Sequence, residues 1–145
     1  IGYLARTANL LGIATPKIAC IAPSEQLLPN VISSTEGAQL AKMADRGQLG
    51  NVVVDGPLSL DVALYKEVAE HKKVKGSSVA GDPDCLLFPN LESANVFFKS
   101  VSHLCGGELA AMVMGTKVPC VLTSRGDTSK TKLFSIALAC LAVKK

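Results

Sequence analysis

The sequence predicts an α/β protein, with a mainly parallel sheet between helices in a three-layer αβα arrangement. Segments with helical periodicity alternate with short apolar segments along the 145 residues, which is typical of parallel strands joined by crossover helices. Two apolar segments, NVVVD at 51–55 and DCLLFP at 84–89, are uninterrupted, as strands buried on both faces should be. The composition, 48% hydrophobic but only 4% aromatic, indicates an aliphatic core.

The first expected element is a helix over 1–13, where apolar residues recur at helical spacing. Thr15-Pro16 should end it, because the residue before a proline avoids the helical conformation. The apolar segment KIACIAP at 17–23 follows as a strand, and 24–33 as a loop.

The second expected helix covers 36–47, and Thr35 is a plausible N-cap because its hydroxyl can accept a hydrogen bond from the first turn. After the strand at 51–55, Gly56-Pro57 should turn the chain. A third helix is expected from Ser59 or Leu60 to about Lys73.

The remaining elements follow a loop at 76–83 and the strand at 84–89. A helix over 91–104 should stop at Gly106-Gly107. Two more strands are expected on either side of a tight turn, so this pair could be antiparallel. These strands cover 109–114 and 118–123, and a last helix covers 128–143.

Several function classes are disfavoured. A net charge of +3 is too small to indicate nucleic-acid binding, and no apolar run reaches the roughly 18–20 residues that a membrane helix needs. The five cysteines include no C-x-x-C pair, so we expect no metal site, but buried free thiols in a cytoplasmic protein. The glycine-rich loops of P-loop and dinucleotide-binding proteins and the G-x-S-x-G motif are absent. The chain starts without Met and in mid-helix pattern, so a preceding segment is expected.

Polar residues follow the expected strand ends, where open α/β sheets bind ligands. Asp55 could face a ligand or bond to turn amides, and the turn role is the default. Asn90 and Glu92 could also face a ligand, but stabilisation of the start of the next helix is their default role.

The segment TSRGDTSK at 123–130 joins a strand to a helix N-terminus, which suits an anion. Ser124 adds a hydroxyl, and Arg125 adds a planar cation that matches phosphate. The alternative, that Ser124 or Asp127 only caps the helix and Arg125 is solvated, has equal weight.

Taken together, the loops resemble the phosphate acetyl/butyryltransferase family in order and spacing, and TSRGD is closer to its butyryl branch. The matching segments are KMADRG at 42–47, VDGPLSLD at 54–61, VAG at 79–81, LFPNLESAN at 87–95, GTKVP at 115–119 and LTSRGD at 122–127.

The resemblance implies a fold like that of isocitrate/isopropylmalate dehydrogenases, with an active-site cleft between two domains. The chain would be the C-terminal half of such an enzyme and form a homodimer. Residues 1–117 would belong to the second domain, and 118–145 would be a terminal strand and helix that pack on the first. The implied substrates are coenzyme A, acyl phosphate and inorganic phosphate, with no further cofactor.

The resemblance also implies roles for particular residues. Ser124 and Arg125 occupy the catalytic Ser-Arg pair. Thr131 stands where the acetyl branch has the Asp thought to be the base, so Asp127 is the nearest carboxylate for that role. The predicted substrate-binding residues are Asp55, Pro57, Asn90, Glu92, Asn95 and Thr123.

Two alternative functions remain: a non-catalytic domain of this fold that binds coenzyme A or acyl phosphate, and a metal- and NAD-dependent decarboxylating dehydrogenase.

Overall fold

The computed structural model describes residues 1–143, which form two compact units, one over residues 1–93 and one from Ala94 onward. The first unit contains a three-stranded parallel sheet in the order β2-β1-β3. The prediction of an α/β protein with parallel strands is therefore confirmed. The strands are β1 (Lys17–Ile21), β2 (Val53–Leu58) and β3 (Cys85–Leu87).

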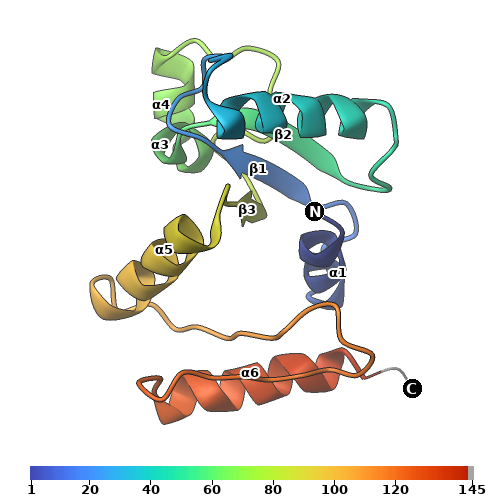
Figure 1. Cartoon of the computed structure of the whole chain (residues 1–145), viewed down its shortest axis with the longest axis vertical. Coiled ribbons are helices and arrows are strands. Elements are labelled where there is room, and N and C mark those ends of the chain that lie inside the picture. Colours follow the sequence, from blue (N-terminus) through green and yellow to red (C-terminus); the bar gives the residue numbers. More distant parts are fainter. Residues whose placement is uncertain (144–145) are drawn as a thin grey trace. The chain divides into compact units, whose positions relative to one another are not determined.

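Alternation of side chains along β1 gives the first unit two apolar layers, one on each face of the sheet. Ile18 and Cys20 point to one face, where residues of α1 and α2 and Val54 of β2 pack on them. Ala19 points to the other face, toward Val62 of α3 and Ala69 of α4. Figure 1 shows α2 lying along β2. The helices of this unit are α1 (Gly2–Leu10), α2 (Ile32–Asp45), α3 (Leu60–Leu64) and α4 (Lys66–His71).

Two glycines let α2 approach the sheet at backbone distance. A Cβ atom added to Gly56 of β2 would lie 3.4 Å from Gly37 Cα of α2, and only 2.6 Å from Cys20 Cβ of the neighbouring strand β1, closer than real side chains come. A Cβ atom added to Gly37 of α2 would lie 3.3 Å from Pro57 Cα. Helix and strand therefore touch with almost no side chain between them.

The second unit consists of two helices joined by extended chain. Helix α5 (Leu91–His103) begins at the end of the first unit and ends where Gly106 adopts a φ of +66° and Gly107 N–H donates to Val101 O. The predicted stop at these glycines is confirmed. Helix α6 is Ser129–Leu141. Every fully buried apolar side chain of residues 1–143 lies in the first unit, whereas in the second unit Thr131 and Ser135 are the buried residues.

The prediction of two strands in the second unit is wrong. In place of strands at 109–114 and 118–123 the described chain has one isolated antiparallel bridge, Val113 with Cys120. The antiparallel direction agrees with the tight connection, but the flanking residues lack the ladder of backbone partners that a strand requires.

Three boundaries in the first unit also differ from the prediction. Gly56-Pro57 lies inside β2 and is not a turn. The helix predicted to run to Lys73 is divided at Tyr65, whose φ and ψ of −121° and 117° are extended. Thr35 is not an N-cap, because α2 begins at Ile32 and the Thr35 hydroxyl donates to the Ile32 carbonyl within the helix.

The five cysteines are all free, but they are not uniformly buried as predicted. Cys20 is buried, and burial raises its thiol pKa to about 11. Cys105 and Cys140 are exposed. Among residues 1–143, no helix combines the length and apolar character needed to cross a bilayer.

Candidate active site

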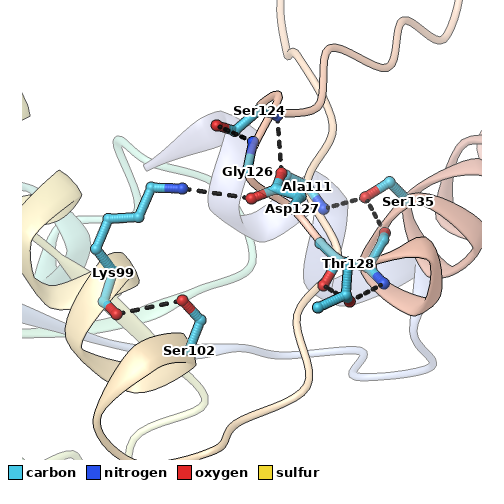
Figure 2. Close-up of polar contacts among 9 residues, drawn as sticks. Lys99, Ser102, Ala111, Ser124, Gly126, Asp127, Thr128 and Ser135 are labelled. Atoms are coloured by element: carbon cyan, nitrogen blue, oxygen red, sulfur yellow. Dashed lines mark hydrogen bonds and ion pairs between the residues drawn. The ribbon is translucent and has the colours of Figure 1, made fainter.

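The segment before α6 is a compact turn built by Ser124 and Asp127. The Asp127 backbone N–H donates to Ser124 O (3.1 Å), and the Ser124 backbone N–H donates to Asp127 Oδ2 (2.8 Å). The Gly126 N–H points at Ser124 Oγ at a longer 3.4 Å. Figure 2 shows this ring of contacts. The geometry fixes the backbone of Ser124 while Ser124 and Arg125 remain exposed.

Asp127 has a partner on each carboxylate oxygen. While Oδ2 accepts from Ser124, Oδ1 pairs with Lys99 Nζ of α5 at 3.3 Å, and the Asp127 side chain is 11% exposed. The Ser124 N–H, and after it Lys99, lowers the pKa of this carboxyl below its ordinary value. Asp127 is therefore ionised at neutral pH.

Thr128 caps helix α6. Its Oγ1 accepts a hydrogen bond from the Thr131 backbone N–H at 3.1 Å, and the two threonine hydroxyls lie 3.1 Å apart. The alternative in which Ser124 or Asp127 caps the helix is therefore wrong. Deeper along the helix, the buried Ser135 hydroxyl accepts from Ala111 N–H and donates to Thr131 O, which fastens the extended chain to α6.

A pocket of about 330 Å³ opens beside the turn, within the second unit. The turn and the start of α6 form one side of it, and the end of α5 with its following glycines forms another. Lys130 and Glu108, which form an ion pair, both line it. The lining residues are Ser102, His103, Gly106, Gly107, Glu108, Leu109, Gly126, Asp127, Thr128, Lys130 and Thr131.

Two of the predicted site residues of the first unit, Asp55 and Asn90, have local hydrogen-bond partners. Asp55 lies within β2, and its Oδ1 accepts from the next N–H, that of Gly56, at 2.8 Å. Asn90 Oδ1 accepts from Ser93 N–H at 2.8 Å, so Asn90 caps α5 as its default role predicted. Pro57 is buried, and Glu92 is exposed in the first turn of α5.

In the second unit, the structure joins Ser124 to Asp127 but leaves the other predicted residues outside this turn's hydrogen bonds. Asn95 is exposed on α5, and Thr123 is half-buried just before Ser124. Among residues 1–143, no three metal-ligating side chains gather closely enough to hold an ion.

Residues 3–140 match the family model described as "Phosphate acetyl/butaryl transferase". The chain belongs to this family. It is 46% identical over 136 residues to a phosphate butyryltransferase of Clostridium acetobutylicum, covering 94% of the chain and 45% of that protein. It is 41% identical over 139 residues to a phosphate acetyltransferase of Thermotoga maritima, covering 96% of the chain and 47% of that protein.

A solved structure supports the same relationship at the level of the fold. The crystal structure of a branched-chain phosphotransacylase from Enterococcus faecalis V583 superposes with a TM-score of 0.83 and 33% identity, covering 94% of the chain and 49% of that structure. The chain thus spans about half the length of the phosphate acyltransferases that it matches.

Sequence reasoning about this family member missed Lys99 and Thr128. Lys99 follows Asn95 by one helical turn, so both lie on the same face of α5, and this spacing was the available signal. For Thr128, the signal was its position directly before a lysine-rich helical segment. Ser124 and Asp127 were the other candidates for the capping role.

Proposed function

We propose that the protein containing this chain transfers an acyl group, acetyl or butyryl, between coenzyme A and phosphate. The observation that carries the proposal is the turn before α6, in a chain of the phosphate acetyl/butyryltransferase family: it fixes the Ser124 backbone and leaves the Ser124 and Arg125 side chains exposed. This placement supports a role for both side chains toward an anionic substrate.

The chemistry needs only groups that stabilise negative charge. A thiol with a pKa near ~8.5 must lose its proton to become the nucleophile. The thiolate sulfur forms a bond to the acyl carbon of the acyl phosphate. The bond between that carbon and the oxygen that bridges to phosphorus breaks, and phosphate leaves with the electron pair. Negative charge develops on the acyl oxygen, where the Ser124 hydroxyl and the Arg125 guanidinium would stabilise it.

The group that accepts the thiol proton remains a prediction. Asp127 is the nearest carboxylate to the Ser-Arg pair, but its lowered pKa and two occupied oxygens support a positioning role rather than proton transfer. The proposed substrate-binding residues are Asp55, Pro57, Asn90, Glu92, Asn95 and Thr123.

The same proposal extends to the architecture of the whole protein. We place residues 1–117 in the second of two domains, and 118–145 in a terminal segment that packs on the first, in a homodimer with a fold like that of isocitrate/isopropylmalate dehydrogenases. The exposed apolar residues of α6, Leu133, Ile136 and Leu141, support a further surface that covers this helix.

A second candidate is a non-catalytic domain that binds coenzyme A or acyl phosphate. Thr131 favours it, because its buried hydroxyl beside Thr128 cannot act as the carboxylate base expected at this position from the family's acetyl branch.

The test is an acyl-transfer assay on the complete gene product that contains this chain. With coenzyme A and butyryl or acetyl phosphate, we expect thiol consumption on the order of 10 per second, and little or none from residues 1–145 alone. In parallel, titration calorimetry measures the binding of coenzyme A to the complete product. Coenzyme A binding by the complete product without turnover would instead support the non-catalytic domain, and neither binding nor turnover would refute both.

A further inference from the structure

The ion pair between Lys99 and Asp127 links α5 to the turn that carries Ser124. Asp127 bridges two groups, because one carboxylate oxygen takes the Ser124 backbone N–H at 2.8 Å and the other takes Lys99 Nζ at 3.3 Å (Figure 2). Ser124 is thus connected through Asp127 to a lysine that lies outside its own segment.

The arrangement is more than an ordinary surface ion pair. The Lys99 and Asp127 side chains are 36% and 11% exposed, whereas those of the exposed pair Lys42 and Asp45 are 63% and 62% exposed. A pair in which one partner is largely covered loses less of its attraction to screening than a fully exposed pair. Asp127 is also hydrogen-bonded to a backbone amide, so its position constrains the main chain directly.

The geometry points to Lys99 as a positioning residue that acts on Ser124 through Asp127. Lys99 holds the Asp127 carboxylate in the orientation that accepts the Ser124 N–H, and this sets the direction of the Ser124 hydroxyl. The inference rests on the proposed function insofar as the Ser124 hydroxyl meets the substrate. A displacement of such groups by about 1 Å is enough to cost on the order of a hundredfold in rate.

The test is a cycle of variants in the complete gene product, with kcat expressed per folded molecule. Lys99→Met removes the charge and keeps most of the side chain. We expect it to lower kcat about tenfold or more, and by less than about twofold when Ser124→Ala is already present, because the group that Lys99 positions is then absent. Lys99→Arg should restore most of kcat. The control is Lys75→Met, an exposed loop lysine of the first unit, which should leave kcat unchanged.

Hydrogen exchange at the Ser124 amide gives a readout that needs no activity. Lys99→Met should accelerate exchange there, because the acceptor Asp127 loses its anchor, while Lys75→Met should not. Equal falls of kcat in both backgrounds, or unchanged exchange, would overturn the inference. Accelerated exchange in a protein without transferase activity would keep the positioning role and reject the proposed function. If Lys99→Met does not fold, Asp127→Asn breaks the same ion pair and replaces it in both measurements.

Discussion

At the scale of single residues, the candidate site separates groups that are held from groups that are free to act. The Asp127 and Thr128 side chains accept hydrogen bonds from the backbone of the turn and of α6, respectively. Arg125 is exposed, and within residues 1–143 its side chain forms no hydrogen bond or ion pair. An exposed, unpaired guanidinium contributes little to folding, and it is free to meet the anionic substrate of the proposed function.

Replacing Arg125 should therefore affect turnover and spare stability. Arg125→Ala in the complete gene product should lower kcat about a hundredfold or more, because a cation facing the developing negative charge is lost. The free energy of unfolding should change by only about 0.5 kcal/mol. Arg125→Lys should restore part of the rate, since lysine keeps the charge but lacks the bidentate fork.

The measurement is turnover and melting temperature for each variant. Arg6→Ala, at an exposed position of α1, is the control and should change neither. A melting temperature many degrees lower for Arg125→Ala, with unchanged turnover per folded molecule, would make Arg125 a structural residue.

At the scale of elements, the sequence predicted what depends on local pattern and failed where distant partners decide. The helical periodicity of α1, α5 and α6 and the apolar segments of β1 and β3 were sufficient to place these elements. The segments at 109–114 and 118–123 have the composition of strands, but in the described chain a single bridge joins them. Composition cannot show whether a neighbouring strand is present to complete the hydrogen bonding.

The extension of β2 through Gly56-Pro57 has a similar cause. A glycine-proline pair signals a turn locally, yet here the close approach of Cys20 and Gly37 requires a residue without a Cβ in the strand. At the site, the helix N-terminus that follows Asp127 could be predicted from 123–130, but the strand expected before it is replaced by one isolated bridge, and anion binding there stays a prediction. The pairing of Lys99 with Asp127 could not be predicted, because it spans 28 residues.

Three segments of the first unit meet in an ion-pair network around Lys72. Its Nζ lies 3.1 Å from Asp61 Oδ2 in α3 and 3.4 Å from Glu25 Oε2 in the loop after β1. A hydrogen bond from Ser59, and then Lys72, lowers the pKa of Asp61 from 3.8 to about 2. Because the folded-state pKa is depressed, the stabilisation is complete above about pH 4 and is lost as the pH falls toward 2.

Asp61→Asn should remove this dependence. Relative to the wild type, the variant should be less stable at pH 7, and the difference should shrink between pH 4 and 2, because the wild-type carboxylate becomes protonated there. Urea denaturation across this range measures it. Asp45→Asn, in the exposed Lys42–Asp45 pair, is the matched control and should show a smaller difference at pH 7. A difference for Asp61→Asn that stays constant with pH would contradict the assignment.

At the scale of the whole molecule, stability is concentrated in the first unit, where every fully buried apolar side chain of residues 1–143 is found. Part of this packing depends on the loop over 76–83, which brings Val79 into the core and Gly81 against α4. The Gly81 N–H donates to Ala63 O at 2.9 Å. The loop is thus a structural part of the core and not only a connection.

Two glycines of this loop allow a matched comparison of global stability. Gly81 and Gly76 have φ values of +82° and +76°, but a Cβ atom on Gly81 would lie 2.5 Å from Lys66 Cα, while one on Gly76 would meet nothing within 4 Å. Gly76→Ala should cost about 1 kcal/mol for the backbone conformation alone. Gly81→Ala should cost roughly 1–3 kcal/mol more, because α4 must shift. Denaturant unfolding checks this, and equal losses would mean that the contact with Lys66 relaxes freely.

The backbone contact between α2 and β2 has a consequence for motion. Where Gly37 meets Gly56, no side chain lies between helix and strand that could change its rotamer and let the helix slide over the strand. Sliding would require the two main chains to separate first. We therefore expect α2 and β2 to move together as one rigid body, and a change in the shape of the first unit to take place in the loops around them.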